Sequence, residues 1–446
     1  MNVALIIFYM SNLSRLLVYF VIFGCARHSP NKFGSALACT KISSSTKIIP
    51  IQPTINNMKH TLRQLLFTAL AVMPAALFAQ DDVRDQFNPV TTAVTSQSIA
   101  ADARAAGLGD TGAATDPDVN SQSWNPAKYP FTISRAGLAI NYTPWLRQLT
   151  DGIALLNAAG YIRLGDYQAL SASLRYFTLG DVMTDDENTT VKPYEMGVDV
   201  AYSRMLSEKF SAAVALRYMY SDLSGHYDDS TKPGSAFAAD IACYYNTYFN
   251  LGQRESQFAL GLNISNIGTK ISYGDDNSYF IPTNLRLGIN FMVPINEYNR
   301  FSICADANKL LVPSKPLQMA DESNEDYELR LRKDYYDVSS ISGIFKSFSD
   351  SERGFKGEME EIQWSVGAEY VYNDKFSLRG GYHHESKMQG NRKYFNVGAG
   401  FRMNVMAIDA AYTIATSPSN PLDQTLRVSL AFDFDGIKDF FSRRRR

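Results

Sequence analysis

From residue 132 to residue 435, hydrophobic and polar residues alternate with a period of two. This period is that of a β-strand, whose successive side chains point to opposite faces. The last such segment shows the pattern clearly, because one parity is apolar and the other is polar: Leu426, Val428, Leu430, Phe432 and Phe434 alternate with Arg427, Ser429 and Asp433.

The alternating segments predict an all-β fold with fourteen strands, an even number that lets a single-chain barrel close. We expect the strands at 132–142, 152–164, 168–180, 193–206, 209–221, 234–246, 256–268, 283–294, 298–309, 361–373, 375–383, 393–403, 405–414 and 423–434.

The connections between these strands alternate between short and long, as they do in outer-membrane barrels. The pattern predicts a 14-stranded antiparallel transmembrane β-barrel over 132–435, in the cell outer membrane, with both termini periplasmic. One link, 247–255, is longer than this rule expects. A soluble β-sandwich would also alternate, but it would not need alternating link lengths. The short links are 165–167, 207–208, 373–374 and residue 404, and the long ones are 181–192, 222–233, 269–282 and the outer loop 310–360.

Composition narrows the class further. The chain has 446 residues, 43 Lys and Arg against 45 Asp and Glu, and a net charge of −2, so nucleic acid is not the expected partner. Past residue 80 no apolar run approaches the ~18 residues of a spanning helix. Two cysteines remain there, Cys243 and Cys304; the strand parity places them on opposite faces, which predicts two free thiols.

A targeting segment precedes the rest of the chain. Residues 58–79 have a basic start and an apolar stretch that ends at Ala79, which predicts a signal peptide. Residues 1–57 are then an upstream mis-start or an unstructured segment, although Ile22 to Cys25 faintly resembles a lipoprotein cleavage site. Residues 436–446 form a basic tail.

Residues 80–131 do not alternate and predict a periplasmic N-terminal segment and an inserted plug. A helix-like stretch over 98–106 stops at Gly107, in the position of a C′ glycine. The glycines match a dinucleotide-binding pattern, but a helix precedes them and no βαβ unit follows, so we expect close backbone packing. The predicted plug residues are Gly107, Gly109, Asp110, Gly112, Trp124, Asn125 and Pro126.

No motif nominates a catalytic residue, a metal site or a cofactor. His383 and His384 are adjacent on a strand and face opposite ways, so they are poorly placed to share a metal. The acidic clusters of the loops lack the spacing of a calcium loop. A Ser–His pair assembled in space stays open, because triads are not visible in linear spacing.

The 310–360 loop contains an apolar stripe at helical spacing, formed by Ile341, Ile344, Phe345 and Phe348. Such a stripe either caps the barrel or forms a partner-docking surface. We expect it to contact a cargo domain or a secretion pore.

The runs Ala101–Thr115 and Asn120–Tyr129 resemble the plug of the PorV family of the type IX secretion system, and further similar stretches extend over 88–435. The Asn-Pro-Ala element at 125–127 also occurs in the wider FadL-like family of transporters. The resemblance implies a non-enzymatic outer-membrane component that binds the C-terminal signal domains of cargo. It implies shuttling of cargo from a secretion pore protein to a cell-surface sortase-like enzyme, which attaches cargo to lipopolysaccharide.

Two alternatives remain open at this point. A FadL-like transporter of hydrophobic small molecules predicts an apolar lumenal pocket behind the plug. A lipopolysaccharide acyl hydrolase predicts an accessible nucleophile. An outer-membrane lipid or lipopolysaccharide is an expected contact in each case.

Overall fold

The computed structural model describes residues 87–147, 150, 152–183, 190–224, 231–319, 321–416, 420 and 422–435. The predicted signal peptide at 58–79, residues 1–57 and the basic tail 436–446 lie outside the described residues. The description below concerns the unit that runs from Asp81 to Arg446.

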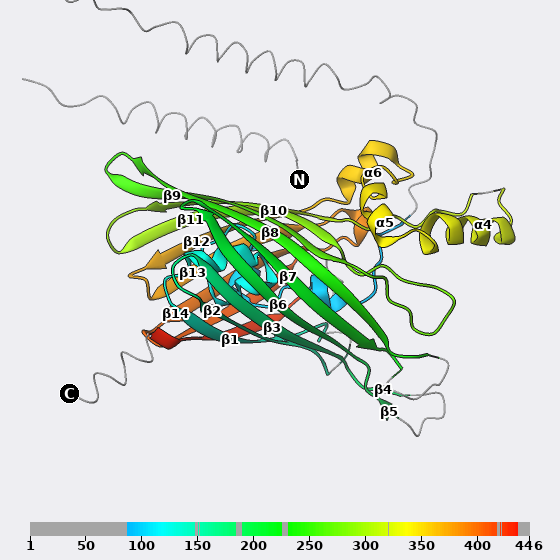
Figure 1. The fold of residues 1–446 in the computed structure, drawn as a ribbon, viewed down its shortest axis with the longest axis horizontal. Helices are drawn as coiled ribbons and strands as arrows, with labels where there is room; N and C mark the ends of the chain where they lie inside the picture. The colour runs from blue at the N-terminus through cyan, green and yellow to red at the C-terminus, as the bar shows by residue number, and fades with distance from the viewer. Residues whose placement is uncertain are drawn as a thin grey trace, which may run out of the picture. The chain divides into compact units, whose positions relative to one another are not determined.

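Fourteen antiparallel strands form a closed barrel, as predicted (Figure 1). The first and last strands close it, with Gly137 opposite Asp433. The barrel strands are β1 (Ala136–Pro144), β2 (Ile153–Arg163), β3 (Gln168–Leu179), β6 (Tyr194–Ser207), β7 (Phe210–Asp222), β8 (Gly234–Leu251), β9 (Arg254–Gly268), β10 (Asn284–Pro294), β11 (Asn299–Leu310), β12 (Gln363–Tyr372), β13 (Phe376–His384), β14 (Lys393–Arg402), β15 (Met406–Ala415) and β16 (Leu426–Asp433).

The largest differences from the predicted strand boundaries occur at two places. The first strand begins at Ala136 and not at residue 132, because Thr132 is the C-cap of the short 3-10 helix and residues 133–135 form a bend. The link expected at 247–255 is wrong, since β8 and β9 continue through it to a tight turn at Gly252 and Gln253. Gly252 has a φ of 69°, a conformation that glycine adopts without a steric penalty. The short links therefore alternate with the long ones at this position too.

The two faces of the wall differ as the period of two requires. Outward side chains are apolar and exposed, for example Val200 at 54%, Leu216 at 62% and Phe237 at 65%. Inward positions carry buried polar groups such as Asp199 and Arg217. This arrangement buries the apolar face in acyl chains and leaves no open strand edge in hydrocarbon. None of the helices in the described residues is long and apolar enough to cross a membrane.

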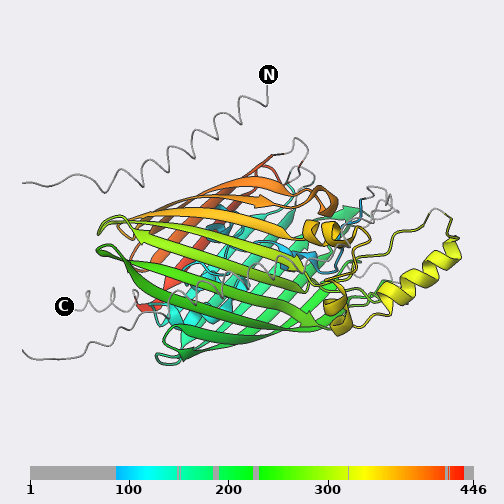
Figure 2. The same ribbon diagram turned by 90° about the horizontal axis from the view of Figure 1, so that it is seen from above.

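The long connections gather at one end of the barrel and the tight turns at the other (Figures 1 and 2). At the long-loop end, a small hairpin of β4 (Val182–Met183) and β5 (Thr190–Val191) follows β3. The loop between β11 and β12 holds α4 (Asn324–Leu331), a π-helical turn (Arg332–Tyr336), α5 (Ser340–Lys346) and α6 (Gly354–Glu360).

The two ends of the described chain lie at opposite ends of the barrel. β16 finishes at the tight-turn end, but residues 88–93 lie among the long loops (Figure 1). The Ala93 N–H donates to the Phe280 carbonyl over 2.9 Å, and Asn88 Nδ2 donates to the Lys315 carbonyl over 2.8 Å. The N-terminus itself lies outside the described residues, so the placement of both termini in the periplasm stays a prediction. Residues 88–93 enter the lumen from the long-loop end.

Candidate functional site

The lumen is filled by the segment that precedes β1, which confirms an inserted N-terminal region with short helices (Figure 2). Its elements are η2 (Thr95–Ser98), α3 (Ala103–Gly107), η3 (Val119–Ser123) and η4 (Pro126–Phe131). Asp102 joins two of them. Its Oδ1 accepts from the Ala105 N–H over 2.9 Å and so caps α3, while its Oδ2 accepts from Trp124 Nε1 over 2.6 Å. Trp124, a predicted plug residue, is thereby fixed at 4% exposure.

The predicted glycines pack closely, as expected, but the helix before them has other bounds than predicted. α3 starts at Ala103 and includes Gly107 as its last residue, so Gly107 is not a C′ glycine. Gly109 and Asp110 are both left-handed, with φ of 74° and 65°, and a Cβ on Gly109 would lie 2.6 Å from the Tyr382 nitrogen of the wall. A Cβ on Gly112 would lie 2.3 Å from the Trp124 ring. Both positions therefore exclude larger residues.

Asn125 connects two parts of the plug with each other and with the wall, and Pro126 follows it at the start of η4. Asn125 Nδ2 donates to the Ala113 carbonyl over 3.0 Å and to the Cys243 carbonyl of β8 over 2.9 Å. Its Oδ1 accepts from the Ala127 N–H and caps η4, where Pro126 occupies the first turn and lacks the N–H that would be left unpaired. The amide of Asn125 thus uses its carbonyl and its amino group in a fully buried position.

Wall side chains hold the turn around the glycines. Asp306 Oδ2 of β11 accepts from the backbone N–H groups of Gly112 and Ala113, over 2.8 and 2.9 Å. Asp110, another predicted plug residue, accepts from the Tyr394 hydroxyl of β14 over 2.5 Å. Cys304 lies beneath this turn against Thr111, and both Cys243 and Cys304 are free thiols, as expected.

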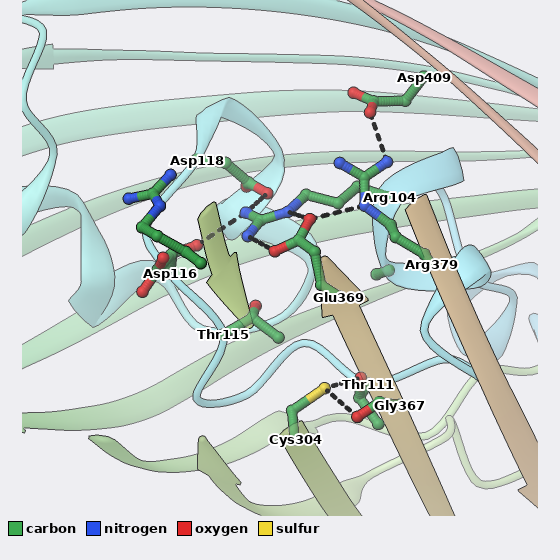
Figure 3. A network of polar contacts seen from close by, with 12 residues as sticks. Arg104, Thr111, Thr115, Asp116, Asp118, Cys304, Gly367, Glu369, Arg379 and Asp409 are labelled. Atoms are coloured by element: carbon green, nitrogen blue, oxygen red, sulfur yellow. Dashed lines mark hydrogen bonds and ion pairs between the residues drawn. The ribbon is translucent and has the colours of Figure 1, made fainter. Parts of the chain in front are cut away.

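An ion network links the plug to the wall at β12, β13 and β15 (Figure 3). Arg104 of α3 pairs with Asp118 of the plug at 2.8 Å and with Glu369 of β12 at 3.1 Å. Glu369 also pairs with Arg379 of β13 at 2.7 Å, and Arg379 reaches Asp409 of β15 at 2.6 Å. Because every member is largely buried, removal of one leaves an uncompensated charge. Glu369, Arg379 and Asp409 hold inward-facing positions of their strands, and the sequence analysis did not single out Arg104.

A small polar cavity of ≈90 Å³ lies in the lumen between the plug and the wall. Its wall includes Arg217, which pairs with Asp199 at 3.1 Å and with Asp240 at 2.9 Å. Arg286 also faces it, with its guanidinium 4.5 Å from the centre of the Trp124 ring. The cavity is small and lined by charges, so it does not resemble an apolar ligand site.

The predicted stripe on the long loop is largely exposed. Ile341, Phe345 and Phe348 are 57%, 73% and 51% exposed, and Ile344 is half-buried. α5 packs instead through Gly343, where a Cβ would lie 2.8 Å from the Phe280 ring. We call Ile341, Ile344, Phe345 and Phe348 the docking surface. The partner-docking role that gives this surface its name stays a prediction.

One acidic group of the loop has the geometry of a cation site, formed by Asp350, Glu358 and Glu361. The Lys309 ammonium already lies there, 3.0 Å from Glu358 and in contact with Glu361. A protein cation thus supplies the charge that a metal would bring. Burial, with Glu361 and Glu358 close by, raises the pKa of Asp350 to about 6.

The histidines at the end of β13 face opposite ways, as expected. His383 is buried and stacks on Tyr394, whereas His384 stacks on Trp364. Ser365 Oγ lies 2.9 Å from His383 Nδ1, a pairing that linear spacing did not reveal. Ser365 is 1% exposed, so its hydroxyl is not presented to a substrate in this structure.

An apolar outer wall, a closed ring of fourteen strands and a filled lumen define an outer-membrane β-barrel protein with a plugged bore. The profile of the family described as Type IX secretion system protein PorV matches residues 82–317, more than half of the 446-residue chain. The chain therefore belongs to the PorV family, a component of type IX secretion.

Solved structures with a similar arrangement are distant. The Ralstonia pickettii toluene transporter TbuX is 12% identical with a TM-score of 0.40, covering 74% of this chain and 97% of that one. The Pseudomonas putida toluene transporter TodX is 11% identical with a TM-score of 0.42, covering 78% and 99%. A Pseudomonas aeruginosa FadL homologue is 13% identical with a TM-score of 0.38, covering 78% and 100%. At these scores the likeness carries no argument about substrate. No curated protein matches the chain by sequence.

Proposed function

We propose that this protein binds the C-terminal signal domains of secreted cargo at its outer loops. It then delivers them from the secretion pore protein to a sortase-like attachment enzyme at the cell surface. Membership of the PorV family supports a role within type IX secretion. The finer role rests on the docking surface described above, which is exposed and apolar at the long-loop end.

The proposal rests on two features taken together: the lumen is filled by the plug, and the long loop exposes apolar side chains. A bore closed by buried ion pairs such as Arg104–Glu369 offers no path for a folded polypeptide. A secretion component that does not conduct cargo is expected to act through its surface. Exposed Phe345 and Phe348 would bury apolar area against a partner, at roughly 25 cal/mol for each Å² removed from water.

The test is secretion in cells that carry the double variant Phe345→Ser, Phe348→Ser in place of the parent protein. We expect cargo to accumulate in the periplasm and to be lost from pull-downs of the solubilised barrel. The matched control is Leu329→Ser on α4, an apolar residue of 68% exposure outside the docking surface. Normal secretion and unchanged pull-downs in the double variant would refute a role for this surface in cargo delivery.

The two alternatives find less support in this fold. A transporter of hydrophobic molecules calls for an apolar lumenal pocket, whereas the cavity beside the plug is lined by Arg217, Asp199 and Asp240. An acyl hydrolase calls for an accessible nucleophile, whereas Ser365, the serine that pairs with His383, is 1% exposed. Incubation of the purified barrel with lipid A tests the second alternative directly, because hydrolysis would release fatty acid.

A further inference from the structure

The outward face of the wall is hollowed where β6 to β9 approach α5. The hollow has a volume of ≈620 Å³, within the ~300–1,000 Å³ typical of ligand sites. Its lining is almost entirely apolar, and α5 contributes one side chain from the long loop. The main contributors are Val200, Leu216, Phe237, Ala239, Ile267 and Ile341.

An irregularity in strand pairing accompanies this hollow. The register between β8 and β9 shifts between Ala239 and Ile241, which marks a bulge in the wall. Asn266, opposite the shift, has a φ of 60°, and its N–H donates to Asp240 Oδ1 over 2.7 Å. Arg217 holds Asp240 from the lumen side. The bulge is therefore fixed by buried polar contacts and is part of the folded wall.

Small residues leave the floor of the hollow empty. Ala239 lies on the outward parity between the bulky Phe237 and Ile241, and Gly268 ends β9 nearby. A Cβ on Gly268 would lie 2.2 Å from the Phe237 carbonyl oxygen, so the two backbones approach closely there. The small side chains at these positions leave the volume of the pocket unfilled.

We propose that this pocket binds one acyl chain of an outer-leaflet lipid, with the lipid headgroup next to α5. The occupant follows from continuity, because the pocket opens from the wall that carries exposed Val200, Leu216 and Phe237. In a membrane barrel such a wall is covered by acyl chains. The charged residues in the lining, Asp199 and Arg217, pair with each other at 3.1 Å, so the pocket presents no free charge to a headgroup.

The test is native mass spectrometry of the full-length protein, extracted from outer membrane in a mild detergent. We expect the parent protein to retain a lipid mass. Ala239→Phe fills the floor of the pocket and should lose that mass. Ala399→Phe makes the same change at an exposed outward position of β14, away from the pocket, and should retain it.

A second variant guards against a folding defect in the wall. Ile341→Ser alters the pocket from α5 and leaves the strands untouched, and it should lower the retained lipid relative to the parent protein. Absence of retained lipid in the parent, or equal retention in Ala239→Phe, would overturn the proposal. Loss of a co-purifying protein from Ala239→Phe without loss of lipid would also overturn it, because the pocket would then be a protein interface. These outcomes do not depend on cargo delivery.

Discussion

Arg104 of the plug and Glu369 of the wall form a double contact across the lumen, with Nη2–Oε2 at 3.1 Å and Nε–Oε1 at 3.4 Å. Glu369 also accepts from Arg379 Nε, so one carboxylate balances two guanidinium groups. The pair joins residues that are 265 positions apart in the sequence. It thereby connects the position of the plug to the strands of the barrel.

Glu369→Gln should loosen the plug while the barrel stays folded. The change leaves Arg104 and Arg379 short of negative charge in a buried site, and the loss of one partner in such a pair costs about 3–5 kcal/mol. We expect increased uptake of a large antibiotic by cells and faster proteolysis of residues 95–131. Heat-modifiable gel mobility should persist, since the strand hydrogen bonds are unchanged.

The control for this variant is Asp374→Asn, which removes an exposed partner of Arg300 at the tight-turn end. The Asp374 side chain is 74% exposed, so its pair is worth about 0–1 kcal/mol. Permeability should match that of the parent protein. Equal permeability in Glu369→Gln and Asp374→Asn would show that the ion network does not hold the plug.

Gly112→Ala should disturb the plug through packing alone. The added methyl would lie 2.3 Å from the Trp124 ring, and this ring is held by Asp102 on one side and by the Arg286 guanidinium on the other. Overpacking of this kind costs about 1–3 kcal/mol. The measurement is the thermal release of the plug, followed by Trp fluorescence. Gly380→Ala is the matched control, because a Cβ there meets no atom within 4 Å.

Strand positions were predictable because lipid and lumen impose opposite demands on alternate residues. That rule put Arg427 on the polar parity of the last strand, where it is buried in the structure, and it gave boundaries within a few residues for most strands. It failed at 247–255, where the polar turn Gly252-Gln253 was read as part of a longer loop. Tight turns at strand ends carry little periodic signal, so the strands were predicted too short there.

The contacts within the plug were less predictable than the wall. The glycines pointed to close packing, but nothing local indicates that Arg104 meets Glu369 or that Asp306 meets the Gly112 N–H. Those pairings depend on where the plug sits in the finished barrel. The path of residues 88–93 was not predicted for the same reason. The alternation of short and long links describes the strands of the wall and carries no information on the segment that precedes them.

The long loop should be more ordered in mild acid than at neutral pH. Asp350 has a pKa raised to about 6, above its usual value of 3.8. The protonated form therefore favours the folded loop, and the contribution is complete below 3.8 and is lost as pH rises through about 6. Limited proteolysis of the 310–360 loop should be slower at pH 5 than at pH 7.5.

Asp350→Asn isolates this contribution, because the amide carbonyl still accepts from the Ser314 N–H while the charge is removed. The variant should show a smaller difference in proteolysis between pH 5 and pH 7.5 than the parent protein. A difference of the same size in both proteins would assign the pH dependence to other groups of the loop.

The orientation of the barrel can be read from cysteine labelling on intact cells. Asn88 lies among the long loops and donates to Lys315, whereas Asn373 lies in the tight turn after β12. If the long loops face the cell exterior, a membrane-impermeant maleimide should label Asn88→Cys on intact cells and Asn373→Cys after permeabilisation alone. The parent protein, with Cys304 buried and Cys243 on the lipid-facing wall, gives the background. Labelling of Asn373→Cys on intact cells would reverse the assigned orientation. An unlabelled Asn88→Cys, beside a labelled cysteine in the 310–360 loop, would instead contradict the path of residues 88–93.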